Sequence, residues 1–424
     1  MTDARSLAFD VLDAVLTRHR PLEQAFEAHP ALSGLEGRDR AFARNLVATA
    51  LRRRGQLDAL VTAFLKKPPR GKGRVVVRIL ELGLVQLLFF QTPPHAAVST
   101  ALDLAERKGV GGLKNLINGI LRRADREAGA LLAAQDAARL NTPDWLWGSW
   151  EKAYGPAGAR AIAQAHLAEP PLDLAMKADG EEWAATLGGS VLPTGGVRLP
   201  TTREITGLPG FRDGAWWVQD AAAQLPARLL GDVAGQTVVD LCAAPGGKTA
   251  QLAAAGASVI AVDLSRHRLA RLEENLARLD LTAETVAADA RSWTPGRAVD
   301  AVLLDAPCTA TGTIRRHPDI PWAKQPADPA RLAAVQADLI AAAGRMLQPG
   351  GRLVFATCSL QPQEGEAHLA AQRDGSLALD SITADEVPGM ADSVNSDGSL
   401  RTLPCQWADR GGLDGFFIAR FRRV

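Results

Sequence analysis

The chain has 424 residues, of which 47% are apolar and 22% are charged, and its formal net charge is +1, a composition typical of a soluble globular protein of two or three domains. It contains no run of about eighteen apolar residues, and its N-terminus lacks the apolar segment of a signal peptide, so we expect a cytoplasmic protein. Four cysteines without a C-x-x-C pair argue against a disulfide framework and a zinc site.

The first part of the chain predicts an all-helical domain over residues 1–132. Apolar residues recur at three- and four-residue spacing in 4–28, 38–66, 74–91, 97–108 and 112–127. The Pro pairs in "KKPPRGKG" and "QTPPH" mark loops between these helices, because proline stops a helix and removes a backbone donor.

This helical part carries most of the positive charge. Residues 1–130 hold 21 Lys and Arg against 13 Asp and Glu, an excess of +8. Nine basic residues and a single acid, Asp58, lie between Arg52 and Arg78, which predicts either a solvated helix face with a loop or a surface that contacts phosphates. The residues predicted to contact RNA here are Arg52, Arg53, Arg54, Lys66, Lys67, Arg70 and Lys72.

A connector follows, and then a different architecture. Residues 140–220 predict a small α+β domain in which "NTPDW" starts a helix. From residue 236 short apolar runs alternate with helical segments, which is typical of a doubly wound parallel sheet, and we assign residues 221–424 to this domain. Residues 384–400 are expected to be flexible.

The predicted strands end in residues with chemical capacity. "TVVDLC" ends at Cys242, "VIAVD" at Asp263, "VAAD" at Asp289, "DAVLLDAPC" at 305–308 and "RLVFATCS" at Cys358. Ligands of open α/β sheets bind outside the carboxyl ends of the strands, so these residues form the candidate site, although any one of the cysteines can instead be a small buried side chain.

The glycine-rich turn "CAAPGGKT" after the first of these strands indicates the ligand. It fails the phosphate-loop pattern because Cys242 stands where the first glycine is needed, and it fails the dinucleotide pattern because no later glycine is in register. The unpaired N–H groups at the start of the following helix favour binding of a carboxylate. Asp263 is placed to accept hydrogen bonds from ribose hydroxyls, and Asp289 is placed to contact the edge of an adenine.

A nucleoside with a carboxylate tail and no pyrophosphate describes S-adenosylmethionine, and this order of features resembles the class I methyltransferases. The segment "GLDGFFIARFRRV" at 412–424 reads as the final antiparallel strand of that Rossmann-like fold.

The loop Asp305-Ala306-Pro307-Cys308 bears on the methyl acceptor. Amine methyltransferases usually have an aromatic residue where this chain has a thiol. C5 of a pyrimidine becomes nucleophilic only after addition at C6, and a cysteine thiolate can make that addition, provided that a helix N-terminus or a cation stabilises it.

Together these motifs carry a family resemblance over nearly the whole chain. "DLCAAPGGKTAQLA", "LLDAPCTATGTIRRHPDI", "FATCSLQPQEGE", "WVQDAAAQ" and "DGFFIARF" resemble the RNA cytosine-C5 methyltransferases of the Sun/RsmB/Nop family. The helical part, with "RSLAFDVLDAVL" and "DRAFARNLVATALRR", is similar to the NusB RNA-binding domain. This fusion points to the bacterial RsmB-like members, which modify 16S ribosomal RNA.

The resemblance implies roles for individual residues. Cys358 is the expected nucleophile and Cys308 the residue that releases the methylated base, whereas the DNA-type pattern would make Cys308 the nucleophile; spacing leaves both open. Asp305 is expected to be shared with the target base. The implied S-adenosylmethionine contacts are Cys242, Ala243, Ala244, Pro245, Gly246, Gly247, Lys248, Asp263, Asp289 and Asp305.

Other residues are expected to place the RNA. Arg315, Arg316 and His317 follow the Cys308 loop and either steer the phosphate backbone or form a solvated loop. Many family members have an Arg-x-Asn-x-x-Lys strand in the connector, but here "PLDLAMKAD" leaves only Asp173 and Lys177, which puts the connector's role in doubt.

Competing functions remain at this stage. One is a non-catalytic RNA-binding factor of ribosome assembly, which predicts a broken cofactor turn or missing thiols. Another is a methyltransferase for a tRNA cytosine or a protein side chain, and the basic helical domain favours structured RNA over protein. We expect a monomer that binds RNA and S-adenosylmethionine, without a metal and without a membrane segment.

Overall fold

The computed structural model describes residues 3–65, 67, 70–200, 204–371 and 376–424. It forms two compact units, one of residues 1–168 with 314–326 and one of residues 169–313 with 327–424. The first unit therefore includes the part of the predicted connector before residue 169. The three-domain division drawn from the sequence stays a prediction.

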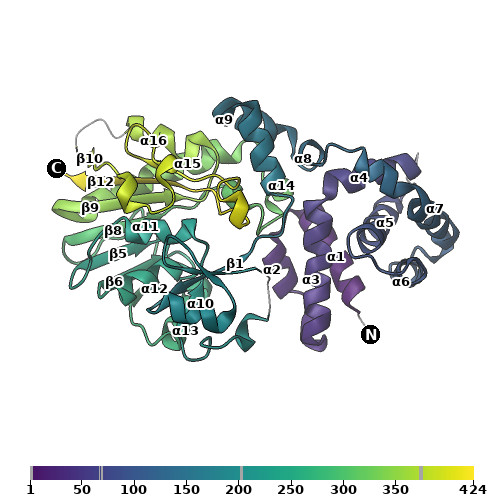
Figure 1. The fold of residues 1–424 in the computed structure, drawn as a ribbon, viewed down its shortest axis with the longest axis horizontal. Coiled ribbons are helices and arrows are strands. Elements are labelled where there is room, and N and C mark those ends of the chain that lie inside the picture. The colour runs from purple at the N-terminus through teal and green to yellow at the C-terminus, as the bar shows by residue number, and fades with distance from the viewer. Residues whose placement is uncertain (1–2, 66, 68–69, 201–203, 372–375) are drawn as a thin grey trace. The chain divides into compact units, whose positions relative to one another are not determined.

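The first unit is helical (Figure 1). Its main helices are α1 (Ala4–Arg18), α2 (Leu22–Glu27), α3 (Gly37–Arg52), α4 (Arg54–Phe64), α5 (Gly73–Leu88), α6 (Pro94–Arg107), α7 (Lys114–Ala133), α8 (Ala137–Leu140), α9 (Asp144–Ala165) and α14 (Ile320–Ala323). The apolar faces of α1 to α7 meet in one core, in which Leu46, Ile79 and Leu121 are fully buried, as the three- and four-residue spacing predicts.

Two of the predicted helices are each broken in two. The segment 4–28 breaks at His19, which has φ 51°, before Pro21. The segment 38–66 breaks at Arg53, whose φ of −105° and ψ of 13° lie outside the helical region. Apolar spacing continues across both breaks because each pair of helices packs on the same core.

Residues 314–326 come late in the chain but belong to the first unit. The backbone N–H of Leu22 donates to Asp319 Oδ2 at 3.0 Å, and Trp322 Nε1 donates to the carbonyl of Leu51 at 2.9 Å. These bonds cap and brace helices α2 and α3, so this segment completes the helical unit.

The second unit begins with a small antiparallel sheet in the order β2-β3-β1-β4. Its strands are β1 (Leu172–Met176), β2 (Ser190–Val191), β3 (Val197–Leu199) and β4 (Trp216–Val218), with α10 (Gly180–Leu187) beside them. Asp173 and Arg198 form a bidentate pair here at 2.6 and 2.7 Å, and both side chains are buried. Asp173 therefore holds the sheet together.

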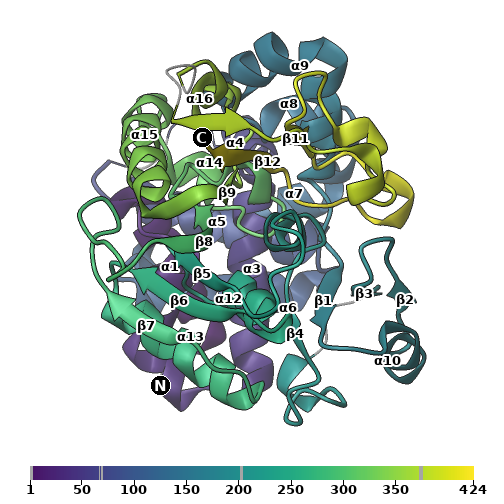
Figure 2. The same cartoon turned by 90° about the vertical axis from the view of Figure 1, so that its left-hand side faces the viewer.

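The larger sheet has the order β10-β12-β9-β8-β5-β6-β7, with β11 beside β12 (Figure 2). Strands β5 to β9 run parallel, and β12 returns antiparallel beside β9. The strands are β5 (Thr237–Leu241), β6 (Ser258–Asp263), β7 (Glu284–Ala287), β8 (Val299–Asp305), β9 (Leu347–Thr357), β10 (Leu377–Leu379), β11 (Leu400–Arg401) and β12 (Phe417–Arg423). This is the predicted class I methyltransferase architecture with its final antiparallel strand.

Helices cover both faces of this sheet (Figures 1 and 2). The shorter helices α11 (Leu225–Arg228) and α12 (Gly247–Ala254) lie with α13 (Arg266–Arg278) on one face, and α15 (Asp328–Met346) lies on the other, next to α16 (Glu366–Ala371). Strands buried on both faces read as continuous apolar runs, which is why the sequence reveals them.

The segment 384–400 is not the flexible loop expected from its composition. Thr383 and Glu386 form a capping box, and Val387 and Met390 are buried in the core. Arg420 of β12 pairs with Glu386 at 2.5 Å. The polar composition of this segment concealed a turn that the buried side chains of Val387 and Met390 hold in place.

Across the part of the chain that the structure describes, no helix combines the length and apolarity needed to cross a membrane.

Candidate active site

The turn after β5 has a backbone that only particular residues allow. Gly246 has φ 101°, and a Cβ there would lie 2.7 Å from Leu272 Cγ. Cys242 adopts φ 61°, which is uncommon for a residue with a side chain. Helix α12 begins directly afterwards at Gly247, so its first N–H groups face the carboxyl edge of the sheet and can bind an anionic group.

The acid that ends β6 closes this turn from the other side. Asp263 is 3% exposed, and its two oxygens accept backbone N–H groups of Ala244 at 3.2 Å and Ser265 at 2.9 Å. Arg268 Nη1 also lies 3.3 Å from Asp263 Oδ2. A carboxylate offers about four acceptor positions, so limited hydrogen-bonding capacity remains for hydroxyl groups.

Leu264, next to Asp263, is 76% exposed and offers an apolar surface that the sequence analysis missed. An apolar residue after a strand-end acid was the available signal.

Asp289 lies two residues beyond the end of β7. Its carboxylate is held by Arg291, with Nη2 to Oδ2 at 2.6 Å, and by the Arg291 backbone at 3.0 Å. The hydrogen bonds from Arg291 lower the pKa of Asp289, so it is charged at neutral pH. Contact of Asp289 with a base edge stays a prediction, because Arg291 already occupies much of the carboxylate.

Lys248 and Asp305 join the turn to the end of β8. Lys248 Nζ lies 2.7 Å from Asp305 Oδ2. Burial opposes the charge on Lys248, but the carboxylate of Asp305 outweighs it and raises the pKa of this lysine. A fixed ammonium beside a carboxylate results, placed where β5 and β8 are neighbours in the sheet.

The two loop cysteines meet at the same edge. Cys308 follows β8 by three residues, Cys358 follows β9 directly, and their sulfur atoms are 3.4 Å apart as free thiols. The hydrogen bond with Cys358 and then burial raise the pKa of Cys308 well above its usual value. Cys308 therefore keeps its proton and can donate it toward the sulfur of Cys358.

The remaining cysteines are unsuited to nucleophilic chemistry. Burial, followed by the nearby carboxylates of Asp305 and Asp263, raises the pKa of Cys242 to about 12. Burial likewise raises the pKa of Cys405. Because the thiolate is the reactive form, these two side chains act through packing.

Two buried acids beneath the site were missed from the sequence. Asp240 inside β5 is fully buried and accepts a hydrogen bond from Thr249 Oγ1 at 2.6 Å; burial raises the pKa of Asp240 to about 7. An acid inside an apolar strand was a usable signal. Glu364, which lies below both cysteine loops, had no such signal because it stands in a polar turn.

The basic residues of the first unit fall into two groups. Arg52, Arg53 and Arg54 bond within the unit: Arg52 Nη2 donates to the Arg315 carbonyl at 3.0 Å, and Arg53 Nη2 to the Leu167 carbonyl at 3.1 Å. Arg54 lies 3.4 Å from Asp58 and 3.8 Å from Glu81. These arginines are largely occupied by helix packing.

The second group lies at the surface. Lys67, Arg70 and Lys72 are exposed, and Lys72 Nζ donates to the Gly109 carbonyl at 2.6 Å; Lys66 lies outside the described residues. Arg315 is 2% exposed, which does not fit the predicted phosphate contact, whereas Arg316 is half-buried and His317 is exposed. Phosphate contact stays a prediction for the exposed residues.

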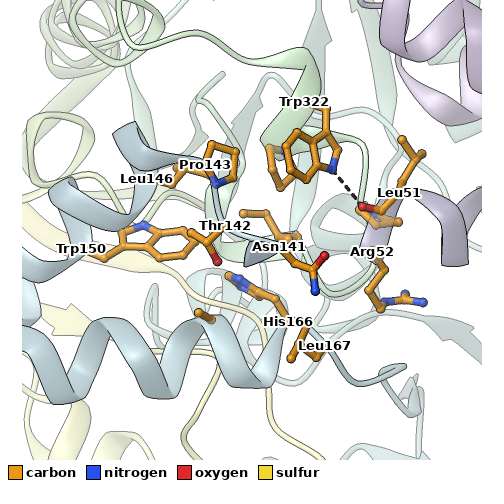
Figure 3. Close-up of a pocket in the computed structure, with 14 residues that line it drawn as sticks. Leu51, Arg52, Asn141, Thr142, Pro143, Leu146, Trp150, His166, Leu167 and Trp322 are labelled. Carbon is orange, nitrogen blue, oxygen red and sulfur yellow. Dashed lines mark hydrogen bonds between the residues drawn. The ribbon is translucent and has the colours of Figure 1, made fainter. Parts of the chain in front are cut away.

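Figure 3 shows the cavity around Arg52 in the first unit. Trp150 and His166 of the α9 region line it with Trp322, and its volume of about 20 Å³ admits no more than one water molecule. This space cannot hold a substrate. In the second unit, a cleft of about 360 Å³ is lined by Lys177, Arg228 and α12 residues, and it contains neither cysteine.

Comparisons with known proteins identify a family for both parts of the chain. Residues 227–422 match the family described as 16S rRNA methyltransferase RsmB/F, and residues 2–126 match the NusB family. Ribosomal RNA small subunit methyltransferase B of Klebsiella pneumoniae is 38% identical, over 87% of this chain and 88% of its own. The protein of that name in Cronobacter sakazakii is 36% identical over 98% of this chain and 97% of its own.

Solved structures share the fold. The crystal structure of PH0851 has a TM-score of 0.77 and 22% identity, and the match covers 100% of this chain and 99% of that one. NSun6 from Pyrococcus horikoshii, solved with SFG, has a TM-score of 0.57 and 21% identity, over 66% of this chain and 98% of that one.

Proposed function

The chain belongs to the 16S rRNA methyltransferase RsmB/F family, and on that premise we propose that it methylates C5 of a cytosine in 16S ribosomal RNA through a covalent cysteine adduct. It is an S-adenosylmethionine-dependent methyltransferase that acts on ribosomal RNA. The observation that carries the finer proposal is the pair of thiols 3.4 Å apart beside the Lys248–Asp305 pair.

The residues of the turn fit the methyl donor. A helix N-terminus after Gly246 suits its carboxylate, the open acceptor positions of Asp263 suit ribose hydroxyls, and exposed Leu264 suits one face of the adenine. When bound, S-adenosylmethionine supplies a methyl group activated on a sulfonium. Gly246 allows the turn to keep this conformation, since a side chain there would clash with Leu272.

The protein's own part in the reaction starts at Cys358. Its thiolate adds to C6, the C5=C6 double bond opens, and C5 becomes the nucleophile that takes the methyl group. Negative charge that develops on the ring during addition is stabilised by the Lys248 ammonium, while Asp305 accepts a hydrogen bond from the exocyclic amine. A base then removes the C5 proton, the double bond re-forms, and Cys358 leaves.

We assign release to Cys308. Its thiol lies 3.4 Å from the Cys358 sulfur, so the two can share a proton as Cys358 leaves the methylated base. The target base must leave its stack, which costs a few kcal/mol, so a loop or opened helix is the expected substrate.

Methyl transfer from labelled S-adenosylmethionine to a 16S RNA fragment tests the proposal. Cys358→Ala should abolish transfer and form no adduct, whereas Cys308→Ala should accumulate a covalent protein–RNA complex on a denaturing gel. Reversed roles would make Cys308 the nucleophile. If neither change matters, a cysteine adduct at C6 is wrong.

The substrate class needs a separate experiment. Bisulfite mapping of cells that lack the protein should show loss of a modified cytosine in 16S ribosomal RNA. An unchanged 16S pattern with a lost tRNA position would point to tRNA, and no loss at all would favour a non-catalytic assembly factor.

A further inference from the structure

We propose that Glu364, acting with Gln336, is a positioning residue that holds the two cysteine loops at the separation that the reaction needs. This inference rests on the proposed cysteine chemistry. Glu364 is fully buried and follows β9 in the short helical turn Pro362–Glu364. Its carboxylate accepts hydrogen bonds from Thr309 and Ser359, the residues that follow the two reactive cysteines.

The contacts on the Cys308 side come first. Thr309, next to Cys308, donates its backbone N–H to Glu364 Oε1 at 2.9 Å and its hydroxyl to Oε2. Pro307, the other neighbour of Cys308, receives a hydrogen bond on its carbonyl from Gln336 Nε2 at 2.9 Å. The same Gln336 nitrogen lies 3.3 Å from Glu364 Oε1, so both neighbours of Cys308 are tied to one pair of side chains.

The Cys358 side is held in the same way. Ser359 Oγ donates to Glu364 Oε2 at 2.5 Å, and Thr357 Oγ1 donates to the Glu364 carbonyl at 2.9 Å. Thr357 and Ser359 are the two neighbours of Cys358. Every residue adjacent to either cysteine therefore bonds to Glu364 or Gln336, and the distance between the sulfur atoms depends on this network.

The chemistry of the network requires a carboxylate. Four donors converge on its two oxygens: the Thr309 N–H, the Thr309 hydroxyl, the Ser359 hydroxyl and the Gln336 amide. A carboxylate has about four acceptor positions and no donor, whereas an amide has one oxygen and would turn an N–H group toward other donors. Glu364→Gln conserves volume but cannot satisfy the set, and a buried donor without an acceptor is costly.

The side chain of Gln336 is itself held by a further hydrogen bond. His368 Nε2 lies 3.0 Å from Gln336 Oε1, and both side chains are buried. Gln336 comes from α15, Glu364 and His368 follow β9, and Thr309 follows β8. Three chain segments far apart in sequence thus fix the two loops, which explains why a polar turn with no apparent motif contains a fully buried acid.

A dithiol probe measures the spacing without methyl transfer. Phenylarsine oxide binds two neighbouring thiols, forms two As–S bonds and releases one water molecule. The wild type should bind one equivalent tightly, and Cys308→Ala and Cys358→Ala should each lose this binding. Glu364→Gln should weaken it at least tenfold, and Thr309→Val, which removes only the hydroxyl, should weaken it less. Glu386→Gln, which disturbs the ion pair with Arg420, is the matched control and should bind as wild type.

Kinetics distinguish positioning from general damage. Glu364→Gln should lower kcat at least tenfold while KM for RNA and affinity for S-adenosylmethionine stay within twofold of wild type. Probe binding equal to wild type in Glu364→Gln would overturn the proposal, as would equal losses in Glu364→Gln and Glu386→Gln. If Cys358→Ala retains transfer, the proposed function fails, but the probe still reports whether Glu364 sets the spacing.

Discussion

Two ion pairs, one in each unit, differ in their surroundings. In the first unit, Arg78 and Glu81 lie on one helix and form hydrogen bonds to each other of 2.7 to 2.9 Å. These bonds allow the two charged side chains to be buried in the packed helices. In the second unit, Lys248 lies in the first turn of α12 and Asp305 ends β8, and they form their 2.7 Å bond beside two free thiols. The same kind of ion pair is structural in one place, and in the other we propose that it contacts the substrate.

Topology explains the difference. Side chains of packed helices meet along the length of each helix, and charges there must find partners inside the unit or point to solvent. Parallel strands end at a common edge, and that edge cannot be covered by the sheet itself. Residues such as Asp305 and Cys358 therefore gather at that edge.

Breaking the ion pair of the second unit should have the largest effect. Lys248→Met removes the ammonium that we expect to stabilise charge on the ring, and it leaves Asp305 without its 2.7 Å partner. Single-turnover methyl transfer should fall about 100-fold or more. The matched control is Lys108→Met, which removes a lysine paired with Asp10 at 2.7 Å in the first unit and should leave the rate near wild type at saturating RNA. Equal losses in both variants would mean that the two pairs do not differ in kind.

In the first unit, the largest expected effect is on stability at low pH. Burial, and then the cations of Arg315 and Arg52, lower the pKa of His166 from 6.5 to about 3. Below pH 6.5 the unfolded chain binds a proton that the folded chain excludes, so stability is full above this pH and declines as pH falls toward 3. The loss from this group should reach about 2 kcal/mol at pH 5.

Urea unfolding at pH 7 and pH 5 measures this loss. His166→Phe keeps a ring beside Trp150, whose centroid lies 5.3 Å from that of His166, but cannot titrate. The difference between the two pH values should shrink by about 2 kcal/mol in this variant. An unchanged difference would show that His166 is not the group responsible.

Features that depend on neighbouring residues in the chain can be predicted from the sequence, whereas contacts between distant residues cannot. Strand ends and the glycine turn follow from apolar runs and short motifs, so Asp263, Asp305, Cys308 and Cys358 were placed correctly at one edge. Glu364 was missed because two of its partners, Thr309 and Gln336, lie 55 and 28 positions away in the chain.

The arginines show the opposite error. A run of charge indicates a surface, yet Arg52 and Arg53 bond to carbonyl groups of residues 315 and 167. Local charge counting cannot reveal an acceptor that lies 263 or 114 positions away in the chain. Arg315 was misread for the same reason, since its burial depends on helices far earlier in the sequence.

Replacing Arg54 tests whether this run is structural. Arg54→Gln leaves Glu81 with Arg78 as its cation and should lower the free energy of unfolding by about 1–2 kcal/mol. Burial already raises the pKa of Glu81 to about 7, and loss of a nearby cation raises it further, so the destabilisation should be larger at pH 8 than at pH 6. Arg70→Gln, on an exposed loop residue, should change stability little; matching losses would contradict the division of the run into two groups.

The exposed residues of this basic run should affect RNA binding instead, and their effect should be the smallest of those predicted. Charge reversal at Lys67 and Arg70 should weaken RNA binding by about 3- to 10-fold and reduce the slope of log K against log salt by about one per lost phosphate contact. Stability and S-adenosylmethionine affinity should stay unchanged, because neither side chain is buried. Arg345→Glu reverses an exposed charge in the second unit and serves as the control. Equal weakening by Arg345→Glu would mean that net charge matters and position does not, whereas no weakening at all would leave the whole run structural or solvated.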